Sequence, residues 1–252
     1  MKNSPNILTI TNLTKSFAGQ EVLADQNLKV QKGEVVVIMG PNGCGKTTLL
    51  NILAGFVRPD GGEVRYAGRT ENEKPGYLMQ NYRASLMPWR NSWQNIGLPL
   101  KIVGKDGDTI RNEVKSISRD SGFQIDLSKF PYQLSGGQAQ IVSLFRALII
   151  GSEIVLLDEP SSNLDYKNSL KMRAFLQNNF IRYRKTFIIV TQSIEEAVQM
   201  GTRILILPRE SGGEIVSIKN PLAFPRRSQD IKSKPFQAVY AQVLSAFLRQ
   251  AD

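Results

Sequence analysis

Apolar residues along this chain fall into two kinds of short pattern. Near the start, ILTITNL at residues 7–13 and NLKV at residues 27–30 alternate apolar and polar positions, as strands buried on one side do. Four later segments are continuous apolar runs of strand length, at residues 35–39, 154–158, 187–191 and 203–207. Such runs indicate strands that are buried on both faces.

Helical patterns separate these buried runs. The segments with this pattern are residues 46–55, 108–122 and 136–150. Buried strands that alternate with helices usually pair in parallel and carry helices on both faces of the sheet. We therefore expect an α/β fold with a parallel-sheet core, and an antiparallel β subdomain formed by the N-terminal strands.

The end of the chain carries an amphipathic pattern. Apolar residues at i, i+3 and i+4 spacing predict a helix there: Phe236, Val239, Tyr240, Val243, Leu244, Phe247 and Leu248. We expect this helix to dock on the domain's own surface in preference to binding a partner. Residues 221–235 are expected to form an exposed linker. The chain then divides into a domain at residues 1–220 and a linker with a C-terminal helix at residues 221–252.

Composition narrows the chemistry that is available. The 252 residues include one cysteine and no histidine, which excludes an internal disulfide, a cysteine-cluster metal site and the usual proton carrier near neutral pH. Catalysis must then use carboxylates, lysine, backbone N–H groups or a hard metal ion that arrives with a substrate. No apolar run approaches the roughly 18–20 residues of a membrane span. MKNSPNILTI has no signal-peptide pattern, so we expect a cytoplasmic protein.

The net charge of +10 leaves several partners open. Basic residues gather at 167–185 and at 226–234, where they could meet nucleic acid, anionic lipid headgroups or only solvent. We favour a solvated face, because aromatic residues that would stack on bases are not interleaved with the charges. No nucleic-acid partner is expected.

The first chemical motif is GPNGCGKTT, which follows the buried run at residues 35–39 and opens a helical segment. It matches G-x-x-x-x-G-K-[ST] in the strand-to-helix context that this pattern requires. The glycines let successive N–H groups point at phosphates, Lys46 reaches the β- and γ-phosphates, and the Thr47 hydroxyl binds Mg²⁺. The motif therefore predicts a site for ATP and Mg²⁺ formed by Gly40, Pro41, Asn42, Gly43, Cys44, Gly45, Lys46, Thr47 and Thr48.

Two adjacent carboxylates end a later buried run. In IVLLDEP, Asp158 is placed to hold Mg²⁺, usually through water, and Glu159 to polarise a water for attack on the γ-phosphate. Two acids at the end of a buried strand are costly unless they meet cations, so a purely structural role explains them poorly. Glu159 and Lys46 are therefore candidate catalytic residues.

A second candidate anion site lies about 20 residues before this carboxylate pair. The motif LSGGQ opens another helix and consists of Leu134, Ser135, Gly136, Gly137 and Gln138. A second phosphate-binding helix start in one chain would be redundant unless it served a different nucleotide. The motif thus predicts a head-to-tail dimer in which each LSGGQ closes on the partner's P-loop.

With these motifs in this order, the chain resembles the ATP-binding subunit of ABC transporters over essentially its whole length. The stretch YLMQNYRASLMPWRNSWQNI at residues 77–96 is most similar to the nitrate, sulfonate, taurine and bicarbonate importer branch. The resemblance implies a P-loop NTPase fold with a helical subdomain at about residues 81–150. It also implies an ATPase that powers transport of a small solute, expected to be an anion such as nitrate, a sulfonate or bicarbonate.

The same resemblance implies partners and a location. The partners are integral membrane permease subunits, a second ATP-binding subunit and, indirectly, an extracellular or periplasmic solute-binding protein. The protein is then peripheral, at the cytoplasmic face of the membrane.

Roles for further residues follow from the resemblance. Phe17 is expected to stack on adenine, and Gln80 to contact Mg²⁺ and the attacking water. The loop that meets the second ATP-binding subunit is expected to contain Ser162, Leu164 and Asp165. Residues 86–93 are expected to line the groove that receives the membrane subunit. Three residues of this stretch fit a place in the domain core equally well: Met87, Trp89 and Trp93.

Three features depart from the family pattern. Gln192 stands where the family has a histidine that contacts the γ-phosphate, and glutamine cannot carry a positive charge. Ala139 and Ile141 stand where basic residues are common, and Cys44 lies inside the P-loop, where inert packing is favoured over a reactive thiol. We therefore expect slow hydrolysis at this chain's own P-loop, with Gln192 as a catalytic residue. A heterodimer with a competent second subunit is favoured over a homodimer in which Glu159 suffices.

Two other classes stay open. A non-transport ABC ATPase that acts on nucleic acid or the ribosome is disfavoured, because the roughly 90 residues between P-loop and LSGGQ contain no sustained heptads and the chain has one nucleotide motif set. An ABC subunit for export or lipid transport is disfavoured by the MPWR stretch.

Overall fold

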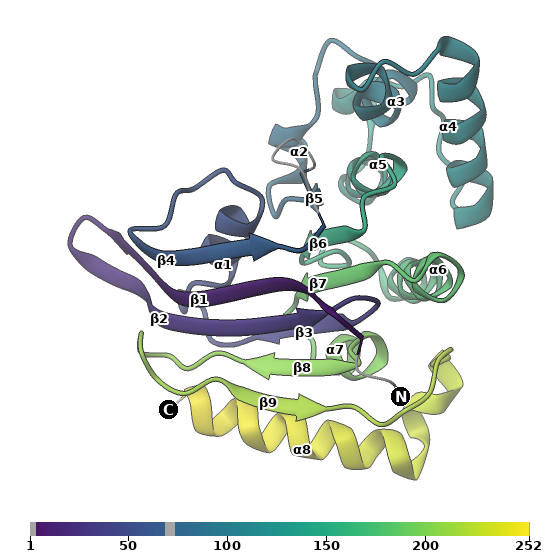
Figure 1. Ribbon diagram of the computed structural model, residues 1–252. Coiled ribbons are helices and arrows are strands. Elements are labelled where there is room, and N and C mark those ends of the chain that lie inside the picture. Colours follow the sequence, from purple (N-terminus) through teal and green to yellow (C-terminus); the bar gives the residue numbers. More distant parts are fainter. Residues whose placement is uncertain (1–3, 69–73, 252) are drawn as a thin grey trace.

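The computed structural model describes residues 4–68 and 74–251, and these residues form two sheets. A three-stranded antiparallel sheet has the order β2-β1-β4, from β1 (Asn6–Phe17), β2 (Gln20–Gln31) and β4 (Gly61–Tyr66). A six-stranded sheet has the order β5-β6-β7-β3-β8-β9, from β3 (Val35–Met39), β5 (Gly76–Leu78), β6 (Ile154–Asp158), β7 (Thr186–Val190), β8 (Arg203–Ile206) and β9 (Val216–Lys219). Figure 1 shows β1, β2 and β4 (purple to blue) beside the larger sheet. The α/β class and the antiparallel N-terminal subdomain are confirmed.

The six-stranded sheet is parallel except at one edge. Strand β3 lies between β7 and β8, with Val36 opposite Ile188 and Arg203. Strand β9 pairs antiparallel with β8, because the chain turns back after Ile206 instead of crossing over through a helix. The expected parallel-sheet core is therefore confirmed, and the edge strand β9 is an antiparallel addition to it. The carboxyl ends of β3, β6 and β7 meet at one edge, which brings the candidate active-site loops together.

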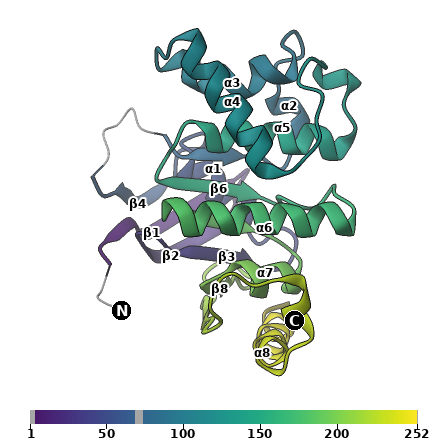
Figure 2. The same cartoon turned by 90° about the vertical axis from the view of Figure 1, so that its right-hand side faces the viewer.

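The two faces of this sheet are covered differently. One face, which includes Val37 and Leu157, packs against helices of the second half of the chain: α5 (Gly136–Ile149), α6 (Tyr166–Tyr183), α7 (Ile194–Met200) and α8 (Lys234–Ala251). The opposite face, which includes Val36 and Ile38, packs against α1 (Lys46–Leu53) and the small sheet. Helices thus lie on both faces, but the second face is shared with strands. Figure 2 shows α6 crossing in front of the strands.

A helical lobe projects from one end of the molecule and α8 lies at the other (Figures 1 and 2). The lobe contains α2 (Tyr82–Ser85), α3 (Ser92–Ile102), α4 (Gly107–Ser121), the short 3-10 helix η1 (Pro131–Gln133) and α5. The apolar pattern does not predict α3, because Gly97 and Pro99 both disfavour a helix interior. Asn91 caps α3 in a capping box with Gln94. A Cβ on Gly97 would lie 2.6 Å from Ile110 of α4, so glycine allows these two helices to pack closely.

The C-terminal segment is more firmly attached than its composition suggests. Helix α8 buries Phe236, Val239 and Val243, which confirms docking on the domain's own surface. The expectation of an exposed linker at residues 221–235 is wrong at Arg226, whose side chain is 3% exposed. The Arg226 guanidinium donates to the carbonyls of Val198 at 2.8 Å and Gly201 at 2.7 Å, and so ties the segment, which includes η2 (Ser228–Lys232), to the end of α7.

The division of the chain near residue 220 stays a prediction. Among residues 4–68 and 74–251, none of the helices combines the length and apolar content that crossing a membrane requires.

Candidate active site

The P-loop at residues 40–45 bends sharply where β3 ends. Gly40, Gly43 and Gly45 have φ angles of 152°, 85° and 94°, which disfavour other residues. A Cβ on Gly40 would lie 2.9 Å from the carbonyl oxygen of Leu207, and one on Gly45 would lie 2.7 Å from Leu23 of β2. Gly45 starts α1 without a side-chain cap, so no capping side chain occupies the N–H groups of the first turn. The loop therefore has the shape that an anion-binding helix start requires.

The Lys46 side chain is buried inside this loop. Its ammonium donates to the carbonyls of Gly40 at 2.9 Å and Pro41 at 2.7 Å, and its side chain is 7% exposed. The Cys44 thiol lies 3.8 Å from the same ammonium, and burial raises the pKa of this thiol. A raised pKa keeps the thiol protonated and unreactive, which supports inert packing for Cys44.

Two oxygen-bearing side chains, Asp158 and Thr47, meet where β6 ends. The Thr47 hydroxyl donates to Asp158 Oδ2 at 2.9 Å. The Asp158 side chain is 2% exposed, and its Oδ1 atom has no hydrogen-bond partner among the described residues. Desolvation raises the pKa of Asp158 to about 6. An unpartnered buried carboxylate oxygen beside a hydroxyl suits a hard cation such as Mg²⁺, so the residues present fit this ion.

Gln80 lies at the same sheet edge. Strand β5 pairs with β6 so that Leu78 is opposite Leu157, and Gln80 and Glu159 each follow two residues later. Gln80 is exposed. The strand pairing therefore brings Gln80, the residue expected to contact Mg²⁺, to the same end of the sheet as Glu159, the expected general base.

Glu159 and Gln192 are in direct contact. The Gln192 amide donates to Glu159 Oε1 at 2.8 Å and to Asn42 Oδ1 at 3.2 Å. Glu159 has a φ angle of 50°, an unfavourable value for this residue, so the bend after β6 is a specific feature of the site. One side chain thus joins the P-loop, the candidate base and the loop after β7.

The LSGGQ motif at residues 134–138, called the signature below, lies at a separate cavity. Ser135 caps α5 by accepting from the N–H of Gln138 at 3.2 Å, and Gln138 Oε1 accepts from the N–H of Ser135 at 3.1 Å. A cavity of about 680 Å³ is lined by residues of the signature and of the predicted dimer loop: Ser135, Gly136, Gly137, Gln138, Asn163, Leu164 and Asp165. None of residues 40–48 lines it. Within one chain, the signature and the P-loop therefore do not line a common cavity here.

Two polar residues that the sequence analysis did not select support these loops. Gln140 of α5 is 1% exposed, donates to the Glu159 carbonyl at 2.9 Å and accepts from the N–H of Asn163 at 3.3 Å. Glu196 of α7 is 2% exposed. The position of Gln140 in a mostly apolar helical segment, AQIVSLFRALI at residues 139–149, is a sequence signal, because a buried amide needs partners.

Phe17 ends β1 and is 46% exposed. The Lys15 ammonium lies 5.2 Å from the centroid of its ring. An exposed aromatic ring is available for stacking, and the role of Phe17 at adenine stays a prediction.

The stretch at residues 86–93 divides between core and surface. Trp93 packs against the main hydrophobic core, whereas the Trp89 side chain is 71% exposed. Asn95 fixes the turn that carries Trp89, since it accepts from the N–H of Met87 at 2.8 Å and donates to the Arg90 carbonyl at 2.8 Å. Of the residues that fitted either role, Trp93 belongs with the core and Trp89 faces outward.

A glycine loop that opens a helix, with a buried lysine and a threonine–aspartate pair beside it, defines the class of P-loop nucleotide-binding proteins. The model of the family described as ABC transporter matches residues 23–162, which is more than half of the chain. The chain therefore belongs to the ABC transporter family, and it is an ATP-binding and ATP-hydrolysing subunit of that family.

Individual relatives agree with this assignment. The chain is 35% identical to the taurine import ATP-binding protein TauB of Escherichia coli over 98% of this chain and 99% of that protein. It is 36% identical to the spermidine/putrescine import ATP-binding protein PotA of Spiroplasma citri over 92% of this chain and 66% of that protein. Among solved structures, it is similar to the dimeric, ADP- and phosphate-bound post-hydrolysis state of the ATP-binding cassette MJ0796, with a TM-score of 0.76 and 29% identity over 86% of this chain and 100% of that chain.

Proposed function

We propose that this chain binds MgATP and supplies one half of a head-to-tail ATP-hydrolysing dimer that drives uptake of a small solute through membrane permease subunits. The observation that carries this proposal is the separation of the signature cavity from the P-loop within one chain. Two copies in opposite orientation would place each signature on the other subunit's nucleotide. The dimeric post-hydrolysis structure of the MJ0796 cassette supports this arrangement.

Each residue near the P-loop has a distinct role in this proposal. Lys46 and the first-turn N–H groups of α1 hold the β- and γ-phosphates. Thr47 and Asp158 would hold Mg²⁺, with Gln80 completing its environment, and the bound ion would neutralise charge on the phosphate oxygens. Glu159 accepts a proton from the attacking water, or polarises it, because its carboxylate is an acceptor at the strand end. Phe17 stacks on adenine.

The contact between Gln192 and Glu159 supports slow turnover at this P-loop. The amide satisfies a carboxylate oxygen without contributing a positive charge, so it orients the base but gives little stabilisation to charge on the γ-phosphate. A heterodimer, whose other subunit supplies a second and faster site, follows from this weakness. The signature of this chain would then close that faster site.

Steady-state ATP turnover of the purified full chain tests this point. We expect Glu159→Gln to lower turnover by about a hundredfold or more, and Gln192→His to raise it by about tenfold. The thermal unfolding midpoint of each variant is measured as well, so that a loss of catalysis can be distinguished from a loss of folding. If wild type and Gln192→His turn over ATP at the same rate, the weak-site proposal is wrong and a homodimer is preferred.

For the solute we keep the expected small anion, such as nitrate, a sulfonate or bicarbonate, and the near full-length similarity to TauB favours a sulfonate. PotA, at nearly the same identity, is named for polyamines, so we propose that the other subunits of the transporter select the solute. The exposed Trp89 on its fixed turn would contact the permease, and this chain would then lie at the cytoplasmic face of the membrane. Affinity purification from the native membrane is the test: a multi-span permease should accompany the wild type and be lost with Trp89→Ala. Recovery of ribosomes or DNA instead would refute a transport role.

A further inference from the structure

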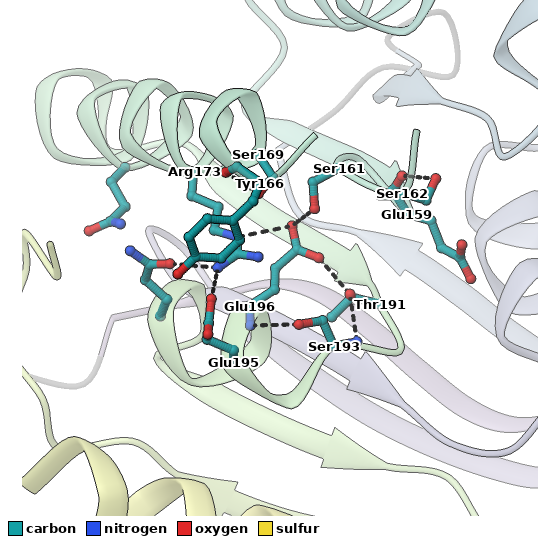
Figure 3. Close-up of polar contacts among 12 residues, drawn as sticks. Glu159, Ser161, Ser162, Tyr166, Ser169, Arg173, Thr191, Ser193, Glu195 and Glu196 are labelled. Atoms are coloured by element: carbon teal, nitrogen blue, oxygen red, sulfur yellow. Dashed lines mark hydrogen bonds and ion pairs between the residues drawn. The ribbon is translucent and has the colours of Figure 1, made fainter. Parts of the chain in front are cut away.

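Glu196 is a buried carboxylate that accepts hydrogen bonds from two loops of the candidate active site. It lies in the first turn of α7 and is 2% exposed. Its Oε2 atom accepts from the Thr191 hydroxyl at 2.5 Å, and its Oε1 atom accepts from the Ser161 hydroxyl at 2.7 Å (Figure 3). Thr191 directly precedes Gln192, and Ser161 follows Glu159 by two residues. Each oxygen of this carboxylate therefore holds one of the two loops that meet in the Glu159–Gln192 hydrogen bond.

The rest of the contacts fix Glu196 in place. Thr191 Oγ1 accepts from the N–H of Ser193, and Ser193 caps α7 by accepting from the N–H of Glu196 itself. Arg173 of α6 lies on the other side, with its Nε atom 4.0 Å from Glu196 Oε1 and its Nη1 atom 2.6 Å from Glu195. The carboxylate is thus anchored by helices α6 and α7, and the loops are the parts that it orients.

Burial of the Glu196 carboxylate costs hydration free energy, so a function that offsets this cost is expected. A buried carboxylate and guanidinium lose several kcal/mol of hydration, and well-packed apolar residues of similar volume are often at least as stabilising. Arg173 Nε has no hydrogen-bond partner among the described residues, so the pair is not optimised for stability. Stability alone therefore does not account for Glu196.

We propose that Glu196 is a positioning residue for ATP hydrolysis, which sets the distance between the loops that carry Glu159 and Gln192. This inference rests on hydrolysis at Glu159. The Ser161 end also reaches the predicted dimer loop, because the Ser161 carbonyl accepts from the N–H of Leu164 at 3.2 Å. A displacement of that loop by the second subunit is therefore passed through the carboxylate to Thr191 and Gln192.

The first test compares two neighbouring acids in the full chain. Glu196→Gln keeps the shape but replaces one acceptor oxygen with a donor, whereas Glu195→Gln is the matched control, because Glu195 contacts Arg173 and neither loop. We expect Glu196→Gln to lower kcat about tenfold while KM for ATP changes less than about twofold, with the control close to wild type. Equal kcat values for the two variants, or a parallel loss of ATP binding, would overturn the proposal.

A second test does not depend on turnover or on the folding of Glu196→Gln. Thr191→Val removes one loop's contact with Glu196, and Thr202→Val is its matched control, since the Thr202 hydroxyl bonds to Val35 at the opposite end of β3. Hydrogen exchange is measured on residues 159–165, which both substitutions leave chemically unchanged. We expect faster exchange there in Thr191→Val but not in Thr202→Val. Exchange that rises only at residues 191–193 in Thr191→Val would show that the carboxylate does not couple the loops.

The two tests also separate this inference from the activity on which it rests. If ATP turnover is insensitive to Glu159→Gln, the assignment of hydrolysis to this P-loop fails, while the exchange experiment still decides whether Glu196 couples the loops. If turnover is normal and exchange at residues 159–165 is insensitive to Thr191→Val, the inference fails alone.

Discussion

Two helices of this chain begin at glycine-rich motifs, and they begin in different ways. Helix α1 starts at Gly45, whose φ angle of 94° is left-handed and which offers no side chain as a cap. Helix α5 starts at Ser135, whose backbone is extended and whose hydroxyl caps the helix in a reciprocal pair with Gln138. One helix start leaves its first N–H groups without a side-chain acceptor, while the other already uses one of them internally.

The charges around the two helix starts differ as well. At α1, a buried ammonium and a buried carboxylate with an unpartnered oxygen surround the loop: Lys46 and Asp158. At α5, the Asp165 carboxylate lines the cavity, caps α6 and bonds to Asn168. The α1 site thus has a lysine and an unpartnered carboxylate oxygen beside its uncapped N–H groups, whereas the carboxylate that lines the α5 cavity already bonds to Asn168 through both of its oxygens. This difference indicates that the signature acts only when a second subunit supplies the nucleotide.

The largest expected difference in ATP binding between the two helix starts comes from removing the lysine at each. Lys46→Ala should weaken ATP binding to the isolated chain by about 2 kcal/mol, or about thirtyfold, because a charged donor to phosphate is lost. Lys171→Ala removes a lysine that lines the signature cavity, and it should leave this binding unchanged. Equilibrium titration with a fluorescent ATP analogue measures both. Equal losses would mean that the signature contributes to binding within one chain.

A smaller effect is expected from crowding the signature. A Cβ on Gly137 would lie 2.9 Å from a terminal methyl of Leu164, which can rotate away, and 3.3 Å from the Asn163 carbonyl oxygen, so Gly137→Ala presses on the backbone of the predicted dimer loop. We expect ATP-dependent dimer formation to weaken by about tenfold while ATP binding to the monomer persists. Gly107→Ala at the start of α4 is the control, since a Cβ there meets nothing within 4 Å. Analytical ultracentrifugation with a slowly hydrolysed ATP analogue gives the two dimer constants, and equal constants would contradict a role for this loop in dimer formation.

The sequence predicts the α1 site better than the α5 site, for a physical reason. The side chains of Lys46, Thr47 and Asp158 are themselves the functional groups, and each lies at a fixed spacing from a buried strand. The motifs alone therefore predict where these groups lie. The surroundings of the signature depend on long-range packing. Gln140 reaches Glu159 only because α5 lies across the end of β6, and spacing along the chain contains no trace of that contact.

The fold shows the same division. The strands β3, β6, β7 and β8 can be predicted from the local apolar pattern alone, because a short, almost entirely apolar segment is most stable as a strand buried on both faces. The antiparallel direction of β9 and the burial of Arg226 depend on tertiary contacts, which the local sequence pattern does not predict. The local sequence predicts Arg226 as an exposed charge in a proline-containing linker, yet its guanidinium donates hydrogen bonds to carbonyls at the end of α7.

The smallest expected effect concerns the cap of α5 itself. Ser135→Ala removes the acceptor for the N–H of Gln138, which should cost about 1 kcal/mol of unfolding free energy. Asp106→Ala is a matched cap deletion, because Asp106 accepts from the N–H of Thr109 at the start of α4, outside the signature and the predicted dimer loop. Denaturant unfolding should give similar losses for the two variants. ATP-dependent dimer formation should fall only in Ser135→Ala, because only that helix start is expected to face the partner's phosphates. A fall of the same size in both variants would mean that the α5 cap serves the lobe's stability and not the shared site.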